Sequence, residues 1–138
     1  MSMRRVIIGD IAIMEEKIGE SAKYCAACPD GTTNTIFTIN GNIVRIDFTR
    51  PDGAKETRHM QFGELHRDDG GPALIIEGNG LLILHWFCMG ARHRAGKPAI
   101  IEYVDKKSYT AFYEHGVRKF FTCNSANVSI RPRSHWQM

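Results

Sequence analysis

The sequence lacks a hydrophobic run long enough to cross a membrane. Its longest purely apolar stretch is Leu81–Leu84, whereas a membrane-spanning helix needs about 20 apolar residues. The start of the chain has a basic flank at Arg4 and Arg5 but no sustained apolar core with a small-residue cleavage site, so we expect no secretory signal. The four cysteines are then expected to remain thiols in a reducing, cytoplasmic compartment.

An excess of charge of one sign is missing as well. Eighteen Lys and Arg residues against 15 Asp and Glu residues leave a net charge of +3. The basic residues are scattered, apart from Arg4-Arg5, Arg92–Arg94 and Arg131–Arg133. Dedicated nucleic-acid binders usually show a concentrated basic stripe. The composition therefore permits a polyanionic partner without requiring one.

Motifs that carry catalysis are absent too. The sequence has no P-loop, no dinucleotide-binding fingerprint, no Gly-x-Ser-x-Gly elbow and no paired-carboxylate constellation. We therefore expect a protein that is not an enzyme and that uses no cofactor and no metal.

What the sequence does contain is an internal repeat. Three segments align on their glycines, with a Gly-Gly-Pro-Ala or Gly-Lys-Pro-Ala step, an apolar run and a turn between them. The aligned segments are Arg58–Arg67, His85–Arg94 and Ala111–Phe120, and the glycines are Gly63, Gly90 and Gly116. Their spacing of about 27 residues is typical of stacked supersecondary units.

Alternation of apolar and polar residues predicts that these units are β-hairpins. Asn40-Gly41 separates the expected strands 35–39 and 42–49, and this dipeptide is a strong hairpin signal because both positions tolerate a positive φ. Residues 54–62 are polar and are expected to form an edge-like strand. Later strands are expected at 72–77, 81–87, 98–104 and 108–113.

One of these strands, Leu81–Phe87, is apolar on both faces. Such a strand must be covered on both sides, by an N-terminal helix, by curvature of the sheet or by a second subunit. This pattern favours a homo-oligomer or a face covered by a partner.

The N-terminal region has a different pattern. Asp10 can cap a helix, and Pro29-Asp-Gly31 can end it. The apolar residues at helical spacing between them are Ile11, Met14, Ile18 and Cys25. We therefore predict a mainly β, α+β fold: an antiparallel meander of stacked β-hairpin repeats with one N-terminal helix. The expected segments are a strand and helix appendage at 1–33, the β-hairpin repeat domain at 34–122 and a tail at 123–138.

The core of the first repeat resembles a known family. Residues Gly63–Ala73 read Gly-Glu-Leu-His-Arg-Asp-Asp-Gly-Gly-Pro-Ala, and an apolar strand, an aromatic pair and Gly90–Arg94 follow. This pattern is similar to the MORN-like repeats of bacteriophage and large-virus proteins, and the match covers roughly residues 40–120. The resemblance implies a sheet of stacked hairpins and does not imply catalysis. A phage origin would suit an accessory protein that blocks a host factor.

The repeated His-Arg pairs have two interpretations. Stacking would place them on one rim of the sheet, as a recognition ridge for a phosphate, a carboxylate or an acidic protein. The alternative is that each pair locks its own turn by hydrogen bonds, and recurrence in step with the repeat favours this structural role. The ridge residues are His66, Arg67, Arg92, His93 and Arg94.

Other candidates depend on weaker patterns. His66, Asp68, Asp69 and His93 could form a metal-dependent hydrolytic site, although nothing in their spacing requires them to converge. Cys25 and Cys28 have the spacing of half a zinc site or of a redox dithiol, and free thiols are the favoured alternative.

Aromatic pairs at Trp86-Phe87 and Phe112-Tyr113 occupy matching repeat positions. We expect one ring of each pair to point inward. In the tail, Arg133 and Trp136 could anchor a partner because Arg and Trp are frequent hot-spot residues. A frayed terminus is the alternative for this segment.

The leading functional hypothesis is a non-enzymatic, phage-encoded binding protein that occupies a surface of a host protein or protein complex and uses the ridge, Arg133 and Trp136. The alternative is a nucleic-acid or nucleotide binder that uses the same ridge. A metal-dependent hydrolase is the third and weakest hypothesis. No membrane contact is expected.

Overall fold

The protein is described by a computed structural model, which covers residues 2–9 and 11–125, and its regular elements are all β-strands. In chain order the strands are β1 (Ser2–Ile8), β2 (Ile11–Ile18), β3 (Ser21–Ala27), β4 (Thr33–Ile39), β5 (Asn42–Thr49), β6 (Lys55–Gln61), β7 (Glu64–Leu65), β8 (Leu74–Gly78), β9 (Leu81–His85), β10 (Phe87–Cys88), β11 (Ala91–Arg92), β12 (Ile100–Val104), β13 (Lys107–Glu114) and β14 (Val117–Ser125).

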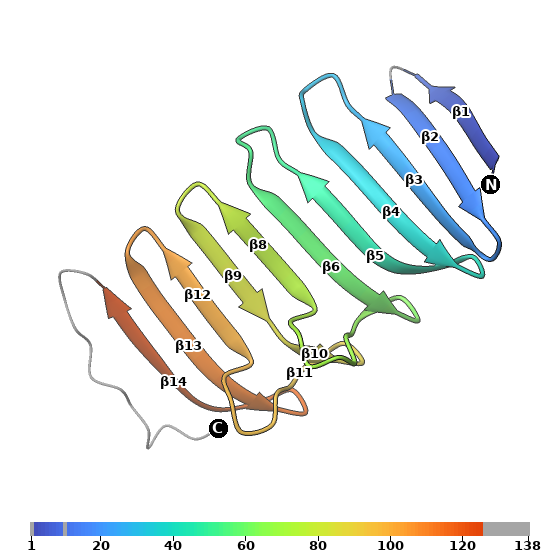
Figure 1. Ribbon diagram of the computed structural model, residues 1–138. Helices are drawn as coiled ribbons and strands as arrows, with labels where there is room; N and C mark the ends of the chain where they lie inside the picture. The colour runs from blue at the N-terminus through green and yellow to red at the C-terminus, as the bar shows by residue number, and fades with distance from the viewer. Residues whose placement is uncertain (1, 10, 126–138) are drawn as a thin grey trace.

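The strands form one long antiparallel meander (Figure 1). The sheet order is β1-β2-β3-β4-β5-β6-β8-β9-β12-β13-β14, so β1 and β14 lie at its two edges. Strand β7 pairs only with β6, and β10 and β11 form a small hairpin of their own. The prediction of a mainly β fold built as a meander of hairpins is confirmed.

The predicted N-terminal helix is wrong, because residues 11–18 and 21–27 are the strands β2 and β3. Gly19 has a φ of 58° and lies in the tight turn between them, where glycine accepts the positive φ that a hairpin turn needs. Ile11, Ile13 and Ile18 are β-branched and therefore suit strands. Within the described residues no helix is long and apolar enough to cross a membrane.

The prediction that residues 54–62 form an edge-like strand is also wrong. Strand β6 pairs with β5 on one side and with β8 on the other. Its polar residues are tolerated there because they find ionic partners within the sheet. The buried Glu56 lies 3.0 Å from Arg50 and 2.6 Å from Arg58.

The long sheet is one layer thick over most of its length (Figure 1). No large side chain among the described residues is fully buried. The buried apolar side chains are Ala54, Ala73, Trp86, Ala99, Ile100 and Ala111, and the buried imidazoles are His66 and His85. Most of these lie where the chain makes a corner between one hairpin and the next. The core of this protein therefore lies largely at its corners.

The strand register places an apolar row on one face of the central strands. Ile75 of β8 pairs with Leu84 of β9, and Leu84 pairs with Ile101 of β12. Leu82 pairs with Tyr103 two residues further along the same strands, and therefore on the same face. We call these five residues the Tyr103 face.

The opposite face of the same strands carries Ile76, Ile83, Leu74 and Ile100. Strand β9, which was predicted to be apolar on both sides, therefore lies in the middle of the sheet. No second layer of described strands covers either of its faces. Chemically the two faces differ, because the opposite face also holds the ion pair between His85 and Glu102 (2.6 Å).

Candidate functional site

The two corners of the chain are built alike. The first corner comprises residues 62–73 and the second comprises residues 89–99. In each corner the chain makes a two-residue turn, runs back beside its own strand and re-enters the sheet at an alanine. Ala73 N–H donates to His85 O (2.9 Å) and Ala99 N–H donates to Ala111 O (2.8 Å). Both alanines are fully buried, so no larger side chain fits at either point.

The histidines of the corners bind the turn of the following unit. The backbone N–H of Met89 donates to His66 Nδ1, and that of His115 donates to His93 Nδ1, both at 2.9 Å. Because Nδ1 of His66 accepts, the proton of the neutral ring lies on Nε2, which faces Asp68 Oδ1 at 2.5 Å. Each imidazole therefore connects two successive repeats.

The arginines that follow the histidines close their own loops. Arg67 Nη1 donates to Pro72 O and Arg94 Nη1 donates to Pro98 O, both at 3.1 Å. Arg94 also lies over the Trp86 ring, with its Cζ 3.9 Å from the ring centroid. Burial lowers the pKa of the Arg94 guanidinium below its usual value.

A glycine makes room for the first of these arginines. A Cβ on Gly71 would lie 2.6 Å from Arg67 Cζ, so a larger residue at this position would have to displace the Arg67 guanidinium. Arg67 Nε lies 2.6 Å from Asp69 Oδ1. The hydrogen bonds from Arg67 and from the Gly71 N–H hold the pKa of the Asp69 carboxyl below its usual value.

Arg92 lies between two aromatic rings. Its Cζ is 5.4 Å from the centroid of Phe87 and 5.7 Å from that of Tyr113. Trp86 is buried and its indole N–H donates to Gly70 O at 3.0 Å, so this ring points inward as predicted. Phe112 is partly exposed and stacks on Phe120, with 4.0 Å between centroids.

The predicted ridge residues are thus brought together on successive corners, side by side. The stacking of the copies is confirmed. Every one of the five makes intramolecular contacts through its polar or cationic group, which favours the locking role over the recognition role. Arg133 and Trp136 lie outside the described residues.

Substitution of Arg94 separates these two roles. We expect Arg94→Ala to lower the free energy of unfolding by about 2 kcal/mol, because it removes a charged hydrogen bond and a cation–π contact to a buried ring. Urea denaturation followed by circular dichroism measures the loss. Lys97→Ala, an exposed neighbour in the same loop, is the control. A loss below about 0.5 kcal/mol, as is usual for surface changes, would contradict the lock and return Arg94 to the recognition surface.

The other sequence candidates fare differently. Within the described residues, no group of three or more His, Cys, Asp or Glu side chains could hold a metal ion. His66 and Asp68 do meet, but as part of the corner. All four cysteines are free thiols, and Cys25 Sγ accepts a hydrogen bond from Thr35 Oγ1 at 3.8 Å.

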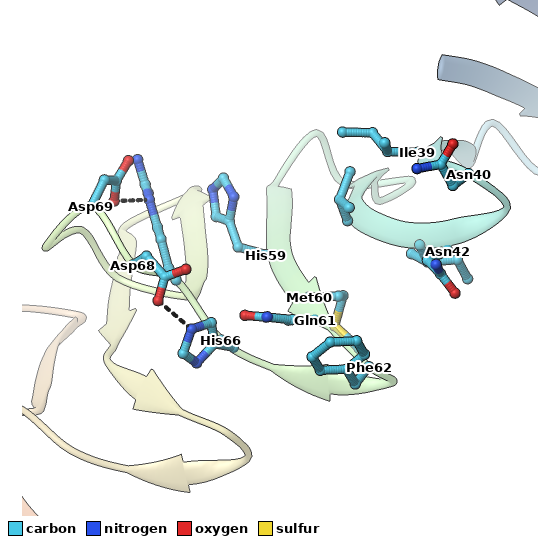
Figure 2. Close-up of a pocket in the computed structure, with 13 residues that line it drawn as sticks. Ile39, Asn40, Asn42, His59, Met60, Gln61, Phe62, His66, Asp68 and Asp69 are labelled. Atoms are coloured by element: carbon cyan, nitrogen blue, oxygen red, sulfur yellow. Dashed lines mark hydrogen bonds and ion pairs between the residues drawn. The ribbon is translucent and has the colours of Figure 1, made fainter. Parts of the chain in front are cut away.

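Sequence reasoning missed a hollow of about 560 Å³ beside the first corner. It lies between the turn at Asn40-Gly41, which joins β4 to β5, and the end of β6 (Figure 2). Figure 2 shows Phe62 at the turn of the first corner, just after the end of β6. His59 lies within β6, on the side toward Asp69. The available signal was Phe62 itself, an aromatic residue at the position that asparagine takes in Asn40-Gly41.

His59 lines this hollow, and its pKa lies below its usual value. Burial lowers the pKa of His59, and the charges of Arg67 and then Arg45 lower it further. Asp69 and Asp47 oppose this effect more weakly. Arg67 lines the hollow and is paired with Asp69, whereas Arg45 lies outside the lining and is paired with Asp47.

Comparison of the chain with protein-family models, with curated proteins and with solved structures found no match. The resemblance to MORN-like repeats therefore stays a prediction, and the class that the fold defines is a single-layer meander of stacked β-hairpins.

Proposed function

We propose that this protein is a non-enzymatic binding protein that lays its open sheet against a surface of another macromolecule. The observation that carries the proposal is the Tyr103 face. Five apolar side chains lie together on strands that no second layer of described residues covers, and Tyr103 alone is 49% exposed. Contiguous exposed apolar patches on proteins commonly mark interaction sites.

The Tyr103 face supports a protein partner better than a nucleic acid. It is made of Ile, Leu and Tyr, and its nearest charged neighbour on β8 is Glu77, which pairs with Leu82. Ridge arginines that would bind phosphates are engaged within the corners. The resemblance to phage repeat proteins makes a host protein or protein complex the proposed partner, which the bound sheet would block.

The test is capture of a partner by the tagged chain from a host lysate, with mass spectrometry to identify it. We expect Tyr103→Lys to abolish capture of the protein that the wild type retains, because a charge within a desolvated patch is costly. The control is Ile8→Lys, which changes an apolar side chain that is 61% exposed and lies on the opposite face.

Both variants should unfold within about 0.5 kcal/mol of the wild type because their sites are exposed. Equal capture by Tyr103→Lys and by the wild type would contradict the use of this face. Light scattering of the wild type and of Tyr103→Lys shows whether the partner is instead a second copy.

A further inference from the structure

The turns along one rim of the sheet have nearly the same backbone conformation. Phe62 and Gly63 have φ values of 51° and 76°, Met89 and Gly90 have 49° and 80°, and His115 and Gly116 have 49° and 83°. Each of the three turns is a two-residue turn that ends in glycine and has a positive φ at both positions. All three turns can therefore be compared atom by atom.

Two of these turns have both N–H groups satisfied by the preceding corner. Met89 N–H donates to His66 Nδ1 and Gly90 N–H donates to Leu65 O (3.0 Å). The turn of the third unit repeats this pair of bonds: His115 N–H donates to His93 Nδ1 and Gly116 N–H donates to Arg92 O (2.8 Å). The acceptors are always one ring nitrogen and one carbonyl oxygen.

The first turn has the same donors but no preceding corner. The hairpin before it ends in the plain turn Asn40-Gly41 and has no return loop. Within residues 2–9 and 11–125, the N–H groups of Phe62 and Gly63 have no acceptor. By analogy with the other two turns, we expect these N–H groups to face the preceding hairpin, on the side where Phe62 lines the hollow of about 560 Å³.

The residue at this turn adds a second, independent observation. A positive φ is unfavourable for a bulky side chain, and Phe62 is 74% exposed, so neither local conformation nor burial explains a phenylalanine there. Exposed aromatic residues held in strained turns suit contact with a partner. Ile39 and Ile43, on the other side of the hollow, are 47% and 40% exposed.

We propose that the hollow between Asn40-Gly41 and Phe62-Gly63 binds an extended segment of a partner protein, and that this segment presents an Asp or Glu carboxylate to the N–H groups of Phe62 and Gly63 and an apolar residue to Phe62. The proposal deepens the proposed function and rests on it. The two oxygens of a carboxylate supply the two acceptors that the preceding corner supplies to the other turns.

A carboxylate is favoured over a neutral acceptor because a hydrogen bond from a backbone N–H to an ionised oxygen is shorter and stronger than one to a neutral oxygen. Arg67 is the cation that lines the hollow, and after burial it contributes most to the lowered pKa of His59. Asp68 and Asp69 also line the hollow, but each is already paired, with His66 and Arg67 respectively. His59 lies on the same side of the sheet as the Tyr103 face. Arg45 of β5 pairs with His59 of β6, and the pair two residues away on the same strands and the same side continues to Ile75 of β8. One partner could therefore contact both.

The experiment uses the full chain labelled with nitrogen-15 and a capped peptide, acetyl-Leu-Glu-Leu-amide, with acetyl-Leu-Gln-Leu-amide as the uncharged counterpart. In the free protein, we expect the amides of Phe62 and Gly63 to exchange with solvent faster than those of Met89 and Gly90. On titration with the Glu peptide, we expect downfield shifts of the Phe62 and Gly63 amide protons, and much smaller shifts with the Gln peptide.

A matched pair of variants tests the role of the aromatic ring. Phe62→Asn keeps a residue that favours this turn and should weaken binding of the Glu peptide roughly tenfold, as expected for loss of an aromatic anchor. Met89→Asn makes the same change at the next turn and should leave the affinity unchanged.

Equal shifts for the Glu and Gln peptides, or equal responses at Met89-Gly90, would overturn the proposal. If the peptide titrations contradict the proposal while Tyr103→Lys still abolishes capture of the partner, the carboxylate site is rejected and the proposed binding function stands. Loss of partner capture in Phe62→Asn, but not in Met89→Asn, would link the site to the partner itself.

Discussion

Trp86→Ala should lower the free energy of unfolding by about 3–5 kcal/mol, the range for removal of a buried aromatic side chain. Trp86 is 8% exposed and is the only large aromatic residue among the buried apolar side chains of the described residues. Its loss would also leave Gly70 O without the indole donor and Arg94 without the ring beneath its guanidinium. A loss of this size is a large part of the stability of a typical domain.

Denaturant unfolding monitored by near- and far-ultraviolet circular dichroism measures this effect. Trp86→Phe is the informative comparison, because it keeps a ring under Arg94 and removes the hydrogen bond to Gly70 O. We expect it to cost about 1–2 kcal/mol. If Trp86→Ala cost less than about 1 kcal/mol, a value ordinary for substitutions in general, the second corner would not be the core of this protein.

His66→Ala should lower the free energy of unfolding by about 2 kcal/mol, because it removes a buried ring and leaves the N–H of Met89 without its acceptor. His66→Asn should recover much of this loss. The side-chain oxygen of asparagine can occupy nearly the same position as Nδ1 of histidine and accept the same hydrogen bond. Denaturant unfolding measures stability, and hydrogen exchange at the Met89 amide reports directly on the bond.

The corresponding change in the second corner, His93→Ala, provides the comparison. His93 makes the same bond to His115 and stacks on its ring, with 4.3 Å between centroids, but it is less buried. We expect a smaller loss of about 1 kcal/mol. Failure of His66→Asn to protect the Met89 amide better than His66→Ala would contradict the assigned role of Nδ1.

These expected results define how a sheet of one layer can be stable. A sheet face in water buries each side chain only against its neighbours, so most apolar residues here are half-buried. The corners add what a second layer adds in other folds: a buried ring, buried alanines and a bond from each unit to the next. Stability should therefore depend on the corners more than on any single strand.

Several features followed from the sequence because they are set by local conformation. A two-residue turn needs residues that accept a positive φ, so Asn40-Gly41 and the three repeated glycines identified hairpins. The recurrence of His-Arg after Gly63 and Gly90 indicated that these copies stack in register, and its structural interpretation predicted the hydrogen bonds of the corner loops. One ring of the pair Trp86-Phe87 was expected to point inward because aromatic residues on paired strands usually pack across them.

The two wrong predictions, of an N-terminal helix and of an edge strand, came from sequence patterns that also fit another structure. Ile11, Met14 and Ile18 fit one face of a helix, yet they also fit the strand β2, and a helix would have needed a surface to cover. The polar composition of β6 suggested an edge because interior strands usually have a covered face. In a sheet with two wet faces, an interior strand can carry Glu56, provided that Arg50 and Arg58 lie beside it.

The sequence alone determined the hairpins, their order and the identity of the corner residues, because turns and alternation act between neighbours along the chain. Only the tertiary structure decided how these units meet. It showed that His66 and His93 accept hydrogen bonds from residues more than 20 positions away, and that the turn at Phe62-Gly63 has no corner before it. A hydrogen-bond donor is left without a partner only when the units are assembled in space, so no local pattern could have identified that position.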